Sequence, residues 1–132
     1  MGNDQQNPLL EVTFEFALAI MQFSEELEGL KKYVIAKQLL RSGTAIGALA
    51  REAQMAESRA DFIHKLKIAQ KEAEETEYWL LLCKHSTNYP NTDERLTNNL
   101  VSIKKLLSRI ISTAIQNENS SKKMTSRMSS TH

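Results

Sequence analysis

Apolar residues recur along four stretches of the chain at steps of three and four residues, which places them on one face of an α-helix. The first stretch begins at Pro8, with Asn7 as the expected cap, and is predicted to end at Gly29, whose missing Cβ permits a left-handed backbone. Three further stretches follow over residues 31–56, 59–85 and 92–117. The pattern therefore predicts an all-α protein.

Short polar segments separate the four predicted helices. Ser58 is the expected cap of the third helix and Thr92 that of the fourth. Long helices joined by short loops pack as antiparallel neighbours, so residues 8–117 are predicted to form an antiparallel up-down-up-down four-helix bundle. Residues 1–7 are expected to be a flexible N-terminus. Residues 118–132 are polar and basic with little to bury, and we expect a disordered tail there.

Two glycines, Gly43 and Gly47, fall inside the second predicted helix. Each costs about 1 kcal/mol relative to alanine at such a position. Close approach by another helix would compensate for this cost, because small residues let backbones come together. A bend in the helix is the alternative explanation.

Some apolar residues lie off the main helical stripes. A broad core explains them, and so does an interface between subunits, because monomers rarely leave large apolar patches exposed. Leu106 and Ile111 of the fourth helix belong to this group. Under the second explanation the oligomer interface is formed by Phe14, Leu18, Met21, Tyr78, Leu82 and Val101.

The composition narrows the class of protein. The 132 residues suffice for one domain, and 4 Gly with 2 Pro are too few for a turn-rich all-β fold. Seventeen Lys and Arg against sixteen Asp and Glu give a net charge of +1, whereas a dedicated nucleic-acid binder usually has a strong basic excess. No segment approaches the roughly 20 apolar residues that span a bilayer, and the polar N-terminus lacks the pattern of a signal peptide. We expect a cytoplasmic protein that does not enter membranes.

Candidate catalytic and metal-binding residues are few. Helical bundles often hold metal ions between glutamates and Glu-x-x-His motifs, and the nearest match here is Asp61 with His64. His64 is expected to be solvated or at an interface. Cys83 is the single cysteine, so it cannot form an internal disulfide or a paired-cysteine zinc site, and it is expected to be a small buried hydrophobe. No nucleophile, Walker or dinucleotide motif is present, so neither a cofactor nor an enzymatic activity is expected.

Charged residues near the apolar stripes suggest polar contacts between helices. Arg41 and Glu52 are eleven residues apart, about three helical turns, and so share one face of the second helix. Glu72 lies close to the apolar ridge of the third helix. We predict an inter-helix polar network of Arg41, Glu52 and Glu72, which would specify packing more than stabilise it. Unpaired surface charges are the alternative.

The middle of the chain carries a distinctive set of residues, namely Gln38 to Ala48, Arg51 to Ala53, Ser58 to Phe62, Lys65, Ala69, Lys71 to Ala73 and Glu77 to Leu80. This set resembles a bacterial four-helix bundle family whose founders are encoded in intervening sequences of 23S ribosomal RNA genes. The resemblance covers residues 8–116 and is most specific between the second and third helices. Ala45 and Leu49 stand where the family usually has Ser and Asn, so Leu49 is expected to add to the core.

The resemblance implies a four-helix bundle that assembles into a homopentamer and is not an enzyme. We therefore expect a non-enzymatic oligomeric scaffold or interaction protein. A related branch, the accessory variability determinant of diversity-generating retroelements, is a basic pentamer that associates with a reverse transcriptase and nucleic acid. The alternative function is therefore a nucleic-acid-binding accessory protein of a reverse transcriptase or RNA-processing system. Its charged surface would be formed, once subunits gather, by Arg41, Arg51, Arg59, Lys65, Lys67 and Lys71.

Overall fold

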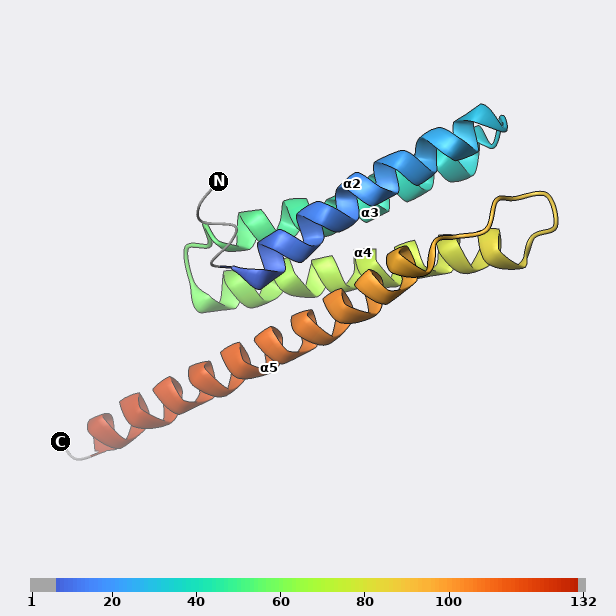
Figure 1. The fold of residues 1–132 in the computed structure, drawn as a ribbon. Coiled ribbons are helices and arrows are strands. Elements are labelled where there is room, and N and C mark those ends of the chain that lie inside the picture. The colour runs from blue at the N-terminus through green and yellow to red at the C-terminus, as the bar shows by residue number, and fades with distance from the viewer. Residues whose placement is uncertain (1–6, 131–132) are drawn as a thin grey trace.

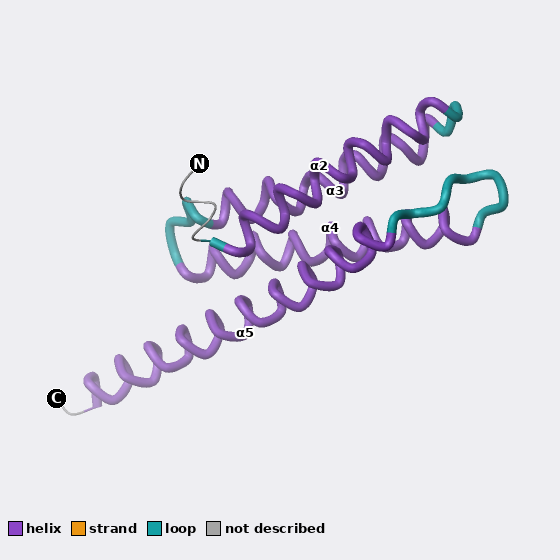
Figure 2. Tube along the Cα trace, in the orientation of Figure 1, coloured by secondary structure: helices purple, strands orange, loops and turns teal. Residues whose placement is uncertain are grey.

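The computed structural model describes residues 7–130 and consists of four helices. They are α2 (Pro8–Gly29), α3 (Tyr33–Ala53), α4 (Arg59–His85) and α5 (Glu94–Ser130). Consecutive helices run in opposite directions and are joined by short connections (Figures 1 and 2). Each helix packs against the next, and α5 also packs against α2. The predicted all-α, up-down four-helix bundle is confirmed.

The ends of α2 show which local signals were predicted correctly. The Asn7 side chain caps the helix by accepting hydrogen bonds from the N–H groups of Leu9, at 3.1 Å, and Leu10, at 3.3 Å. At the other end, the expectation that Gly29 is left-handed is wrong. Gly29 does not have a positive φ, and the left-handed residue is Lys31, with φ of 63°. The backbone turns two residues later than the glycine indicates.

The starts of α4 and α5 are both capped by side chains. Ser58 Oγ accepts a hydrogen bond of 3.0 Å from the Asp61 N–H, as the sequence predicts. The predicted cap of α5, Thr92, is wrong by one position, because α5 begins at Glu94. Asp93 caps it instead, and its carboxylate accepts a hydrogen bond of 2.9 Å from the Arg95 N–H.

Close packing of α2 on α3 explains the two glycines inside α3. A Cβ placed on Gly43 would lie 2.8 Å from Ile20 Cγ1, and one placed on Gly47 would lie 3.3 Å from Thr13 Oγ1. Both glycines and both facing residues are buried. Close approach of the helices, rather than a bend, therefore compensates for the cost of glycine.

The core runs the length of the bundle along the inner faces of the four helices. Phe16, Ile20, Leu39, Ile46 and Leu66 are completely buried. Ile111, which the sequence pattern places off the main stripe, is buried, and Leu106 is half-buried. Leu49 is partly buried and packs against the core.

Residues 118–130 are helical in the structure, where the sequence predicts a disordered tail. They continue α5 past the end of the bundle (Figure 1). Residues 119–128 are all exposed, as expected from their scarcity of apolar side chains. The segment has no Gly or Pro to stop the helix, so α5 continues, and the Arg59 side chain of α4 donates a hydrogen bond to Ser121 Oγ within it. Residues 1–6 of the expected flexible N-terminus lie outside the described residues.

Candidate functional site

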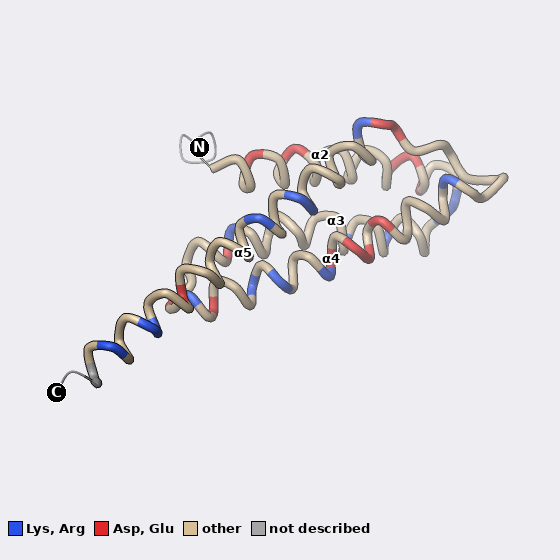
Figure 3. Tube along the Cα trace, turned by 90° about the horizontal axis from the view of Figure 1, so that it is seen from below, with Lys and Arg blue, Asp and Glu red and all other residues tan. Residues whose placement is uncertain are grey.

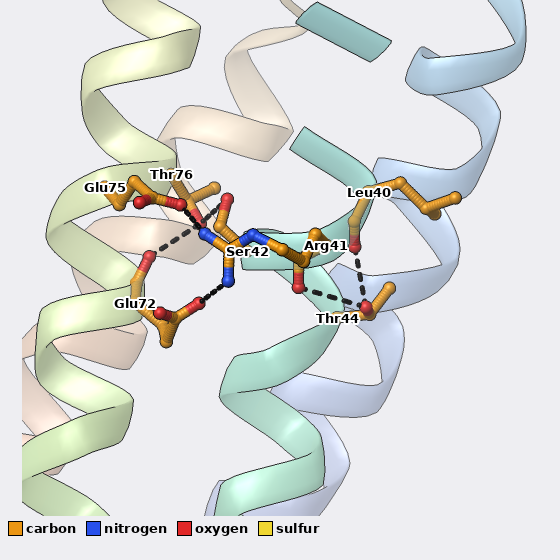
Figure 4. Close-up of polar contacts among 7 residues, drawn as sticks. All are labelled: Leu40, Arg41, Ser42, Thr44, Glu72, Glu75 and Thr76. Carbon is orange, nitrogen blue, oxygen red and sulfur yellow. Dashed lines mark hydrogen bonds and ion pairs between the residues drawn. The ribbon is translucent and has the colours of Figure 1, made fainter. Parts of the chain in front are cut away.

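Polar side chains meet between the middles of α3 and α4 (Figure 4). Arg41 Nη1 lies 3.0 Å from Glu72 Oε2, and Arg41 Nη2 pairs with Glu75. Beside this contact and buried in the core, Ser42 Oγ and Thr76 Oγ1 form a hydrogen bond of 2.9 Å. Arg41 and Ser42 are adjacent in the sequence, so α3 presents a charged contact at the surface and a neutral contact in the core.

The buried hydroxyl pair and the exposed ion pairs contribute differently to the packing of α3 on α4. Ser42 and Thr76 have no exposed surface, and a buried hydroxyl without a partner costs about 1–3 kcal/mol. Thr76 Oγ1 also lies 2.7 Å from the Glu72 carbonyl oxygen of its own helix, so the bond across the helices removes this cost for Ser42, and it does so only when α3 and α4 lie in this register. Half of the Arg41 side chain is exposed, so its ion pairs contribute little to stability. The buried pair therefore aligns the helices.

Glu52 does not join this contact. Its carboxylate lies 3.7 Å from Lys65 Nζ, nearer the end of the bundle where α3 leads into α4. The structure therefore brings together Arg41 and Glu72 of the predicted network and places Glu52 in a separate pair. Arg41 and Glu52 share one face of α3, but this does not bring them into contact. Both carboxylate partners of Arg41 lie on α4.

A second charged contact joins α4 to α5 and was missed by the sequence reasoning. Lys104 Nζ lies 2.8 Å from Glu74 Oε1 and 3.0 Å from Glu77 Oε2. The hydrogen bond to Glu74 raises the pKa of Lys104, the bond to Glu77 adds to this effect, and partial burial opposes it. No local signal marks this contact, since the partners lie 27 and 30 residues from Lys104.

The six basic residues predicted to form a binding surface are spread over two helices and several environments. Arg41 and Lys65 are paired with carboxylates. Arg59 Nη1 donates a 3.3 Å hydrogen bond to Ser121 Oγ of α5. Arg51 lies exposed in the last turn of α3. Lys67 and Lys71 border a cavity beside Lys104 and Glu74. Acids are thus interspersed among the bases on one protomer.

The six apolar residues assigned to an interface all lie on the surface of the single protomer. Their exposed fractions run from 39% for Phe14 to 57% for Tyr78. Leu18 and Met21 are nearly half exposed. The broad-core explanation therefore does not account for them. The exposed residues come from three helices and comprise Phe14, Leu18 and Met21 of α2, Tyr78 and Leu82 of α4, and Val101 of α5.

The residues considered for metal binding or nucleophilic chemistry are not brought together. His64 is exposed, whereas Cys83 is buried, and burial raises the pKa of its thiol. A raised pKa leaves less of the reactive thiolate near neutral pH. Across the described residues, no group of three or more His, Cys, Asp or Glu could hold a metal ion.

None of the helices in the described part of the chain is long and apolar enough to cross a membrane.

Comparisons with known proteins agree with this architecture. No curated protein is significantly similar to the chain. A crystal structure from Bacteroides thetaiotaomicron, of a protein with unknown function from the S23 ribosomal protein family, is 47% identical with a TM-score of 0.73. The match covers 78% of this chain and 97% of the other.

The family comparison covers most of the chain. The model of the 23S rRNA-intervening sequence proteins matches residues 5–109, which include α2, α3, α4 and the first half of α5. The matched span contains the Ser42–Thr76 and Arg41–Glu72 contacts described above. The chain therefore belongs to the 23S rRNA-intervening sequence protein family.

Proposed function

We propose that this protein is a non-enzymatic helical scaffold that acts as a homo-oligomer. The observation that carries the proposal is the exposed apolar surface on α2, where Phe14, Leu18 and Met21 are each between 39% and 47% exposed. Burying apolar surface contributes roughly 25 cal/mol per Å². A row of three large side chains on one helix face therefore gives copies of the chain a reason to associate.

The use of charged residues supports the non-enzymatic part of the proposal. Arg41 binds Glu72 and Glu75 across α3 and α4, and Lys104 binds two glutamates of α4 from α5. Each of these contacts joins two helices. These charged groups are therefore used in contacts between helices, as expected of a scaffold.

Measurement of the solution mass tests the oligomer directly. Light scattering on a sizing column is expected to give a multiple of the 15.0 kDa chain, and the family resemblance suggests five copies. Leu18→Glu should lower the mass, because it places a charge in the row of apolar residues. Lys37→Gln makes the same one-unit change in net charge at an exposed position of α3, outside this row, and should leave the mass unchanged. A wild-type mass of 15.0 kDa at all concentrations would refute the scaffold.

A second candidate is a nucleic-acid-binding accessory role. The supporting observation is the C-terminal part of α5, where Lys122, Lys123 and Arg127 are exposed on a helix that extends beyond the bundle. Binding to phosphates by such residues weakens steeply with salt, with a slope of about −0.7 to −0.9 per contact on logarithmic axes. Titration of labelled RNA and DNA at several salt concentrations tests this role, and absence of binding at low salt rejects it.

A further inference from the structure

Helices α2 and α5 carry opposite charges. Helix α2 contains five glutamates and no Lys or Arg, a net charge of −5. Helix α5 contains seven Lys and Arg against two glutamates, a net charge of +5. Figure 3 shows acidic residues along α2 and basic residues recurring along α5. The near-zero net charge of the whole chain therefore hides two strongly charged helices.

The exposed face of α2 combines acidic and apolar residues. Glu11 and Glu25 follow the steps of three and four residues that join Phe14, Leu18 and Met21, so all five lie on one helix face. All five are exposed. We call these five residues the α2 ridge. It presents an apolar centre with a carboxylate at each end.

A shallow, open pocket of about 620 Å³ lies between the start of α4 and the middle of α5. Phe62, Ile110 and Ala114 give it an apolar floor, and Arg59 and Arg109 add two guanidinium groups. The hydrogen bond from Arg59 to Ser121 Oγ ties this arginine to α5. We call this the α5 pocket, and its complete lining is Arg59, Phe62, Arg109, Ile110, Thr113, Ala114 and Asn117, with no acid among these described residues.

We propose that the α2 ridge of one copy docks into the α5 pocket of a second copy, with its glutamates against Arg59 and Arg109. The apolar centre of the ridge suits the floor of the pocket, and the charges of the two helices are complementary. Opposite potentials steer association and fix its register. This inference rests on the proposed oligomeric function, and it names the two surfaces that meet.

A second copy has to supply the ridge, because the chain cannot fill its own pocket. The buried face of α2, with Phe16 and Ile20, points into the bundle core, so the ridge on the other side points away from it. A contact between two different surfaces of the same protein is heterologous. Such contacts form closed rings when the rotation between copies closes, and open filaments otherwise.

Charge exchange between the two surfaces tests the proposal. Glu11→Lys with Glu25→Lys should weaken assembly about tenfold or more, and so should Arg59→Glu with Arg109→Glu. The chain that carries all four changes should assemble again, because its lysine ridge meets a glutamate pocket. Lys37→Glu with Lys67→Glu makes the same charge change as the pocket variant at exposed positions outside both surfaces, and should have no effect.

Sedimentation velocity at low salt gives the mass of each variant, and circular dichroism shows that each is folded. If a reversal variant does not fold, the Gln substitutions at the same positions replace it. An oligomeric wild type whose mass is unchanged in every variant overturns this inference and leaves the proposed function intact. Failure of the fourfold variant to reassemble while both pairs of changes disrupt assembly also overturns it. A monomeric wild type overturns the proposed function itself.

Discussion

Gly43 of α3 lies against Ile20 of α2 so closely that an added Cβ would be 2.8 Å from Cγ1 and 2.9 Å from Cγ2 of the isoleucine. Both atoms belong to a β-branched side chain that is completely buried. Gly43→Ala therefore has to separate the two helices. We expect it to destabilise the protein by about 1–3 kcal/mol, although alanine is the better helix former. Urea unfolding followed by circular dichroism measures this change.

Gly29 provides the matched control. It ends α2 without a positive φ, and an added Cβ would meet nothing within 4 Å. Gly29→Ala should therefore stabilise the protein by about 0.5–1 kcal/mol through helix propensity alone.

Removal of the Ile20 side chain tests the cause of the Gly43 effect. In an Ile20→Ala background, Gly43→Ala should lower the free energy of unfolding much less than it does in the wild type. An equal cost in both backgrounds would show that the contact with Ile20 is not the cause.

The buried hydroxyl pair between α3 and α4 gives a second prediction. Thr76→Val leaves Ser42 Oγ without its 2.9 Å partner in a site that has no exposed surface. We expect a loss of about 1–3 kcal/mol in the free energy of unfolding. Ser42→Ala in addition to Thr76→Val should recover part of this loss, because both polar partners are then removed. A double-mutant cycle measures the coupling, and a coupling near zero would contradict the alignment role of the pair.

Sequence periodicity was enough to predict the four helices and the inner positions of their stripes. A repeat of three and four residues identifies which side of a helix is buried, and this placed Phe16, Ile20 and Leu39 correctly. It also indicated that Gly43 has a packing role, but it could not distinguish close approach from a bend. That distinction depends on Ile20, which lies 23 residues away on another helix.

Features that depend on which helix faces meet could not be predicted. Lys104 and its two glutamates look like surface charges in the sequence, and only the packing of α4 on α5 brings them together. Glu52 shares a face with Arg41 but pairs with Lys65, because helix ends and helix middles have different neighbours. The left-handed Lys31 was missed since lysine is an uncommon residue for that conformation.

Lys104 should make stability depend on pH in the alkaline range. Its pKa is raised in the folded protein by Glu74 and then Glu77. The stabilisation is therefore complete below the unfolded lysine pKa of about 10.4 and is lost as the pH rises through the folded pKa. Lys104→Gln should lower the free energy of unfolding at neutral pH by about 0.5–1 kcal/mol and flatten its decline above pH 10.4.

Lys105 is the matched control for this measurement. Its side chain is exposed one position further along α5. Lys105→Gln should retain the wild-type decline in unfolding free energy, measured by urea titration at a series of pH values. If Lys104→Gln and Lys105→Gln show the same pH dependence, the contact with Glu74 and Glu77 contributes nothing specific.

The extension of α5, residues 118–130, should be the helical segment whose amides are least protected from hydrogen exchange. Its amides are hydrogen-bonded within the helix, but residues 119–128 bury no side chain against the rest of the protein. Isolated helical segments of this length are marginal in water, so local opening there is expected to cost close to zero free energy. Ile103 and Leu107, earlier in the same helix, are completely buried. Hydrogen exchange should therefore be at least a hundredfold slower around these two residues than across 119–128, roughly the effect of 2.7 kcal/mol of packing. Equal protection along the whole of α5 would contradict this prediction. It would mean that contacts with another copy hold the extension, which lies next to the α5 pocket.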